Sequence, residues 1–153
     1  MELLRAQFRL DWQGIHGVSH WARVRVNGLA LAEQTGADTQ VVELFAFVHD
    51  ARRHNDGWDP DHGLRGAELV QELNGEHFEL GERQREWIVE ACCDHSEGGL
   101  DADVTVQTCW DADRLDLGRV GKRPEPRRLC TDAARRPEMI EWALERSLHR
   151  RGR

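Results

Sequence analysis

The feature that most constrains this chain is an apolar stretch, residues 41–48, that runs directly into His49 and Asp50. Seven of its eight residues are apolar, which is too continuous for a surface helix, so we expect a helix in the core. A core helix that ends in two ionisable groups needs a partner for them, because an unpaired buried charge costs several kcal/mol. A divalent cation satisfies both, since imidazole and carboxylate are common metal ligands. The alternative is a solvated His-Asp pair at a fraying helix end.

Length and composition predict an ordinary globular protein. The 153 residues, 39% hydrophobic and 32% charged, favour a single domain over 1–153 with its core in about residues 12–120. No apolar run approaches the roughly 20 residues that span a bilayer, and the N-terminus lacks the layout of a signal peptide. These features predict a cytoplasmic protein with no membrane partner.

Charge is distributed unevenly along the chain. Residues 119–153 form a basic loop and helix with 11 Arg/Lys and 5 Asp/Glu, whereas residues 1–118 hold 10 Arg/Lys and 23 Asp/Glu. A basic tail of this kind contacts phosphate or nucleic acid in some proteins, and in more of them it folds back on an acidic surface. No nucleic-acid reader motif accompanies it, which argues against a nucleic-acid partner.

Histidines occur at helical spacing near the N-terminus. A helix is predicted from Ile15 to about Glu33, and it places His16 and His20 four residues apart on one face. Val24 continues that face into the core. A lone histidine on an apolar face is usually a core residue bonded to backbone, but two stacked at this spacing make a metal site an equal alternative.

Three further predicted helices carry ligand-type side chains. One begins at Asp59-Pro60, contains His62 and ends near residues 74–75. Another, over 82–95, ends its buried face in His95. The third, over about 104–117, is capped by Asp103 and ends its apolar face in Asp113. Several inward-facing imidazoles and carboxylates in one small helical protein indicate a shared centre.

The pattern His20, His49-Asp50 and Asp113, with the segment Asp-Ala-Asp-Arg-Leu-Asp over residues 111–116, resembles the HD-domain superfamily of metal-dependent phosphohydrolases. His62-x-x-x-Gly66 is similar to a helix of the members that hold two metals. The resemblance implies an all-α fold, a compact helical bundle around a buried metal site. It also implies an enzyme in which a metal-activated water hydrolyses a nucleotide or another small phosphoester. The Gly-Tyr-Pro signature of the cyclic-di-GMP phosphodiesterases is missing.

By that resemblance, one or two divalent ions bind a six-residue set, and Asp50 bridges them. His-rich sites suit Mn, Fe, Co, Ni or Zn better than Mg. Asp50 and Arg53 are the expected catalytic residues. The expected metal ligands are His20, His49, Asp50, His62, His95 and Asp113. The candidates to bind substrate phosphate are His16, Arg52, Arg53 and Arg114.

Two alternatives remain open at this point. Some HD-fold proteins are mixed-valent di-iron oxygenases with a similar set of four histidines and two aspartates. A non-catalytic HD module that acts as a sensor or interaction domain is the other possibility, although intact ligands argue against it. The expected partner of the chain is a small phosphorylated molecule, and the sequence contains no signal for an oligomeric state.

Overall fold

The structure is a computed structural model that describes residues 1–148. Within that range the chain forms helices and no strand, apart from a single β-bridge between Asn74 and Phe78, so the predicted all-α class is confirmed. None of these helices is both long enough and apolar enough to traverse a bilayer. The α-helices are α1 (Glu2–Gln7), α2 (Val18–Thr35), α3 (Thr39–Val48), α4 (His62–Leu73), α5 (Glu82–Asp94), α6 (Val104–Arg114), α7 (Asp132–Arg135) and α8 (Pro137–Leu148), and two short 3₁₀ helices are η1 (Leu117–Val120) and η2 (Pro126–Arg128).

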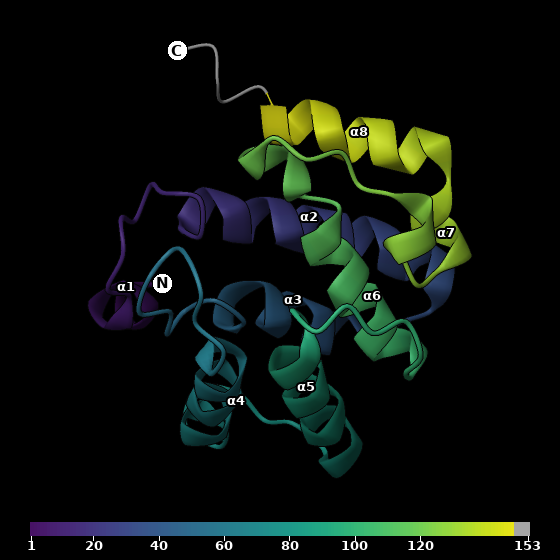
Figure 1. Cartoon of the computed structure of the whole chain (residues 1–153). Coiled ribbons are helices and arrows are strands. Elements are labelled where there is room, and N and C mark those ends of the chain that lie inside the picture. The colour runs from purple at the N-terminus through teal and green to yellow at the C-terminus, as the bar shows by residue number, and fades with distance from the viewer. Residues whose placement is uncertain (149–153) are drawn as a thin grey trace.

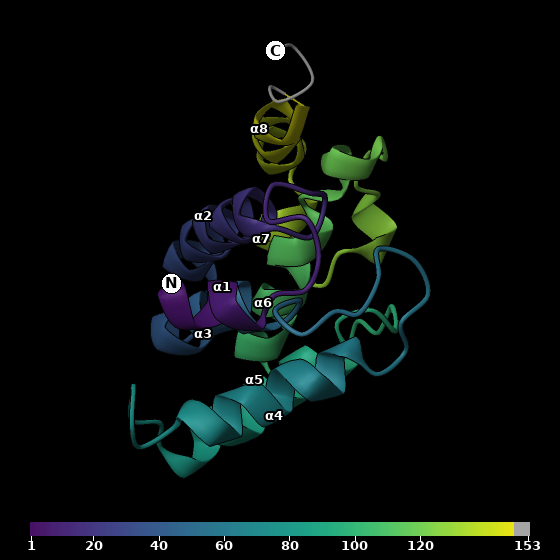
Figure 2. The same ribbon diagram turned by 90° about the vertical axis from the view of Figure 1, so that its left-hand side faces the viewer.

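The helices are stacked around α2 and α3. Helix α2 packs along α3 and α6, while α4 and α5 form a pair that contacts the other side of α3 (Figure 1). Seen from the side, α8 covers α2 at one end of the molecule and the α4–α5 pair forms the opposite end (Figure 2). The C-terminal ends of α3 and α5 therefore approach the N-terminal ends of α2 and α4.

The apolar core has two parts. The larger part lies among the helices from α2 through α6. It includes the fully buried side chains of Trp21, Phe45 and Ile88. The smaller part lies beneath α7 and α8 and includes Leu115 and Leu129. The second cluster attaches the basic C-terminal segment to the helices that carry the candidate site.

Helix α3 forms as its sequence predicts. Asp38 caps it by accepting a hydrogen bond from the backbone N–H of Val41, and the helix ends at Val48, so that His49 is its C-cap residue. The two glycines of α4 allow that helix to pack closely at this end. A Cβ on Gly66 would lie 2.6 Å from the carbonyl oxygen of Val48, and a Cβ on Gly63 would lie 2.1 Å from that of Cys92. Close packing at these glycines places the first turn of α4 against the end of α3.

The predicted start of α2 at Ile15 is wrong, because the helix begins at Val18. Gly14 and Gly17 form a tight turn in which the N–H of Val18 donates to the carbonyl oxygen of Trp12. A Cβ on Gly17 would lie 2.2 Å from that same oxygen, so the turn requires glycine. His16 lies within this turn, and His16 and His20 therefore do not share a helical face.

The predicted start of α4 at Asp59-Pro60 is also wrong. Asp59 accepts a hydrogen bond from the backbone N–H of His54 and forms an ion pair with Arg65. Its carboxylate is thus occupied by the preceding loop, and the helix begins at His62 with Asp61 as the N-cap residue.

Helix α6 is shorter than predicted. It stops at Arg114, from which the chain continues through η1. The cap predicted at Asp103 is confirmed, since its carboxylate accepts from the N–H of Thr105. The expected basic C-terminal segment is described as far as Leu148, and its residues 149–153 lie outside the described range.

Candidate metal centre

Four histidines from four different helices point into one buried space. His20 lies in the first turn of α2, His49 follows α3, His62 begins α4 and His95 follows α5. All four side chains are 5% exposed or less. Two of them come at helix C-termini and two at N-termini, which is why a compact arrangement of the helix ends brings them together.

Each of these rings has its Nδ1 bound to an oxygen. The Nδ1–H groups of His49, His62 and His95 donate to the backbone carbonyls of Phe45, Asp59 and Cys92, at 3.0, 2.5 and 2.7 Å. The Nδ1–H of His20 donates to Oδ2 of Asp116 at 2.7 Å. A carbonyl or carboxylate oxygen only accepts, so the proton of each neutral ring lies on Nδ1 and the lone pair on Nε2.

The four Nε2 atoms face one another in pairs. Nε2 of His20 lies 3.1 Å from Nε2 of His49, and Nε2 of His62 lies 2.9 Å from Nε2 of His95. Two imidazole lone pairs at such distances repel unless a cation lies between or beside them. The tautomers fixed by the Nδ1 contacts therefore make this space a site for positive charge.

Asp50 lies between the two histidine pairs. Its Oδ2 is 3.6 Å from Nε2 of His20 and 3.5 Å from Nε2 of His49, whereas its Oδ1 is 3.4 Å from Nε2 of His62 and 3.7 Å from Nε2 of His95. Two groups of potential ligands result, His20–His49–Asp50 and Asp50–His62–His95, and within each the ligand atoms lie within 4.8 Å of one another. The arrangement suits a carboxylate that bridges two metal ions.

Asp113 completes the first group. Its Oδ1 lies 3.3 Å from Nε2 of His20 and 3.8 Å from Nε2 of His49. This oxygen is buried and has no hydrogen-bond partner, which is costly for a carboxylate unless a cation binds it. An orphaned carboxylate oxygen beside the imidazoles of His20 and His49 fits a divalent metal ion.

The pKa values reflect the same need for positive charge. Burial lowers the pKa of His49 to about 3, so this ring is neutral near pH 7. Burial also lowers the pKa of His20, but the carboxylates of Asp113, Asp116 and Asp50 outweigh it and raise the pKa to about 9. Burial alone would raise the pKa of Asp50, yet the neighbouring imidazoles, first of all His49, hold it well below its ordinary value. The carboxylate ligands are ionised, and their field attracts a cation.

The structure brings the six predicted metal ligands together, and the predicted phosphate-binding residues fall into two groups. Arg53 lies at the site, where its Nε donates to Oδ1 of Asp50 at 2.9 Å. Arg114 lines the same pocket, although its guanidinium donates to the carbonyls of Arg128 and Gly99. It therefore anchors the pocket wall.

The other two residues expected to bind substrate are placed differently. Arg52 lies on another surface and pairs with Glu72 and Gln7. The turn described above directs Nδ1 of His16 to Oδ1 of Asp56, at 2.7 Å, and its ring centroid is 6.4 Å from that of His20. Placing Arg52 at the site was wrong, because consecutive loop residues point in different directions.

Several residues of the site were missed by the sequence reasoning. Asp116 orients His20, and Arg23 in turn pairs with Asp116, its Nε lying 2.6 Å from Oδ1. Asp116 belongs to the 111–116 segment, but 96 positions separate it from His20, and spacing alone does not reveal that contact. Arg119 was also missed, and it approaches Oδ1 of Asp113 at 3.8 Å.

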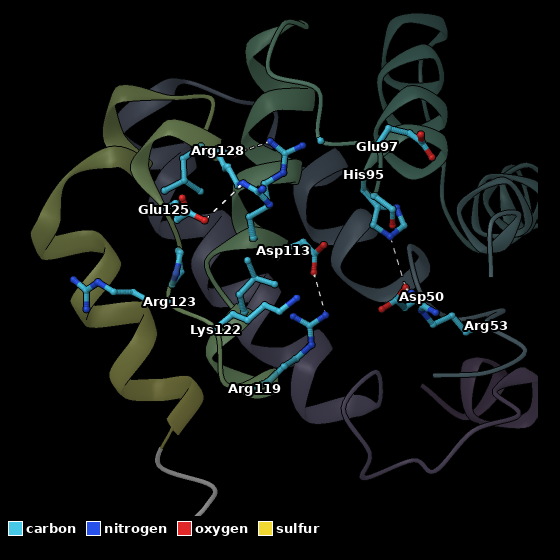
Figure 3. A pocket seen from close by; sticks show the side chains of 16 residues that line it. Asp50, Arg53, His95, Glu97, Asp113, Arg119, Lys122, Arg123, Glu125 and Arg128 are labelled. Atoms are coloured by element: carbon cyan, nitrogen blue, oxygen red, sulfur yellow. Dashed lines mark hydrogen bonds and ion pairs between the residues drawn. The ribbon is translucent and has the colours of Figure 1, made fainter. Parts of the chain in front are cut away.

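The centre opens into a pocket of about 900 Å³. Asp50, Arg53 and His95 lie on one side of it, and Arg123, Glu125 and Arg128 lie on the other, with Asp113 between them (Figure 3). The far wall consists of residues 117–129, the connection between α6 and α7. The volume is within the range of small-molecule sites.

Comparison of the chain with protein-family models, with curated proteins and with solved structures finds no match. The buried cluster of histidines and aspartates is compatible with an HD-type metal site. The geometry of this site is therefore the basis for inferring the function of the protein.

Proposed function

We propose that this protein is a metal-dependent phosphohydrolase that acts on a nucleotide or another small phosphoester. The observation that carries the proposal is the convergence of four imidazole lone pairs and two carboxylates, with the two oxygens of Asp50 shared between two histidine pairs. A metal pair bound there would supply Lewis acidity for a phosphate oxygen and a water that ionises near neutral pH.

The residues of the chain have separable roles in this proposal. Asp50 joins the two ligand groups, and Arg53 holds Oδ1 of Asp50 through its Nε while its guanidinium lines the pocket. Arg119 lines the opposite wall, and its terminal nitrogen lies 3.8 Å from Oδ1 of Asp113. Guanidinium groups on both sides of the centre suit a phosphate that binds between them.

A second candidate function also has support from the donor set. Each ligand group contains two histidines and the carboxylate of Asp50, a combination that binds non-haem iron in oxygenases. A di-iron oxygenase therefore remains the alternative. Oxygen consumption coupled to product formation by the iron-loaded protein would favour it, whereas phosphate release without oxygen would favour hydrolysis.

The test combines metal analysis with an activity screen. Elemental analysis of the purified protein gives the metal and its stoichiometry, and metal-loaded protein is assayed anaerobically against p-nitrophenyl phosphate, bis-p-nitrophenyl phosphate and nucleotides. His49→Ala should lose both the metal and phosphate release. His77→Ala, which changes a half-exposed histidine beyond the end of α4 opposite to His62, is the matched control and should retain both. Equal activity of His49→Ala and wild type would rule out the proposed centre, and a metal-loaded wild type inactive on every phosphoester would argue for a non-catalytic role.

A further inference from the structure

The pocket extends well beyond the metal centre. A single phosphate is far smaller than a volume of about 900 Å³, so the pocket has room for a substrate that also contacts other parts of the wall. Six cationic side chains line this pocket, whereas the only carboxylates apart from Asp50 and Asp113 are Glu97 and Glu125 (Figure 3). The pocket is therefore positively charged away from the metal ligands.

Most of these cations already have partners. Arg53 is bonded to Asp50, Arg114 donates to backbone carbonyls, and Arg119 donates to the carbonyls of Ile15 and Asp116. Arg123 forms its ion pair with Glu141 of α8. The guanidinium groups of these four residues are therefore occupied by contacts within the pocket wall or at the metal end of the pocket.

Two cations on the far wall remain available. Lys122 is the single lysine of the chain, and within residues 1–148 its ammonium group has neither a hydrogen bond nor an ion pair. The Nε of Arg128 lies 3.7 Å from Oε1 of Glu125, beyond hydrogen-bond distance. Glu125 is instead bonded to Arg127, whose Nε lies 2.7 Å from Oε2, so this carboxylate neutralises Arg128 only weakly. Both side chains are exposed, and both line the pocket.

We infer that Lys122 and Arg128 bind a second anionic group of the substrate, away from the metal centre. The substrate class is thus a small phosphoester with one phosphate at the metals and another phosphate or a carboxylate at the far wall. Charge-assisted hydrogen bonds are stronger than those between neutral groups, so this contact favours such substrates over those with a single phosphate. The inference rests on the proposed function, which defines the metal end of the substrate.

Binding of three non-hydrolysable probes tests the inference. Propylphosphonate has one anionic group, 3-phosphonopropionate adds a carboxylate, and propane-1,3-bisphosphonate adds a second phosphonate. Calorimetric titration of the Mn²⁺-loaded protein should give about tenfold tighter binding for at least one two-anion probe than for propylphosphonate. Whichever of these probes binds more tightly identifies the second group as phosphate or carboxylate.

Variants assign the effect to the two residues. Lys122→Ala/Arg128→Ala should remove the preference for the two-anion probe and leave the affinity for propylphosphonate nearly unchanged. Arg85→Ala, an exposed cation at the opposite end of α5 from His95, is the control and should behave as wild type. Thermal unfolding midpoints confirm that each variant is folded. If the double variant is not folded, the titrations are repeated with the single variants Lys122→Ala and Arg128→Ala.

The possible results separate this inference from the proposed function. Equal affinity of wild type for all three probes, or an equal loss of all three in the double variant, would overturn the inference even if the protein hydrolyses phosphoesters. A preference for two anions that disappears in the double variant would support the inference. If the preference persisted in the double variant, the inference would be overturned. If the wild type showed this preference, lost in the double variant, but hydrolysed no phosphoester, the inference about anion binding would stand and the hydrolytic function would not.

Discussion

Helix α6 carries two aspartates, two residues apart, whose surroundings are opposite in kind: Asp111 is fully buried, and Asp113 is partly buried. Asp111 accepts three hydrogen bonds, from the backbone N–H groups of Cys130 and Thr131 and from the hydroxyl of Thr131, at 2.7 to 2.8 Å. Asp113 faces the histidines, and its buried Oδ1 accepts none. The first carboxylate is satisfied by protein donors and fastens the loop before α7 to α6. The second is surrounded by groups that also need a cation.

This comparison distinguishes a structural buried carboxylate from a ligand. Burial raises the pKa of Asp111, and the three donors offset that rise only in part. At Asp113 the imidazole of His20 and the charge of Arg119 outweigh burial and lower the pKa. Burial alone therefore does not identify a metal ligand, whereas the number of donors that face the oxygen does. Four substitutions test which residues belong to the metal centre and which have a structural role elsewhere.

The largest effect is expected for Asp50→Ala. Asp50 belongs to both ligand groups, so its removal should release both ions and lower kcat/KM by about 1,000-fold or more, because metal catalysis contributes several kcal/mol. Elemental analysis measures the loss of metal, and steady-state kinetics measure the loss of kcat/KM. A variant that kept two ions per chain would show that Asp50 does not bridge them.

Asp111→Ala should affect stability instead of metal binding. The substitution leaves the N–H groups of Cys130 and Thr131 buried without an acceptor, so the free energy of unfolding should fall by about 3 kcal/mol. Chemical denaturation measures it, and the folded fraction should keep its metal. Asp132→Ala, at a neighbouring exposed position, is the control. Loss of metal from folded Asp111→Ala would refute the structural assignment.

Asp116→Asn should have an intermediate effect on the metal. Asp116 accepts from Nδ1 of His20 and thereby orients Nε2 toward the centre, so an amide should weaken metal affinity about 10- to 100-fold. Competition with a chelator of known affinity measures the dissociation constant, and saturating metal should restore full occupancy. An unchanged dissociation constant would mean that His20 needs no carboxylate partner.

The smallest effect is expected for Arg52→Ala. Its guanidinium pairs with Glu72 on a surface away from the pocket, so kcat/KM should change by no more than about twofold. Arg53→Ala provides the contrast, because Arg53 touches Asp50 and lines the pocket. A large loss of activity in Arg52→Ala with normal Arg53→Ala kinetics would reverse the assignment of these neighbours.

The sequence predicted helices well where local signals were strong. The apolar run before His49 and the cap at Asp103 each fix a helix through contacts within a few residues, and the structure has these helices. The starts of α2 and α4 were predicted less well. A glycine turn and the contacts of Asp59 compete there with the local helix signals.

By itself, the sequence determined which side chains face inward, because a helical period of 3.6 residues assigns each residue to a face whatever the helix packs against. His20, His49, His95 and Asp113 were found in this way. Only the tertiary structure decided how those faces meet, how Asp116 orients His20 and which arginines reach the pocket. Such contacts join residues far apart in the chain or lie in loops without a period, so their geometry is set by the packing of whole helices and not by any local pattern.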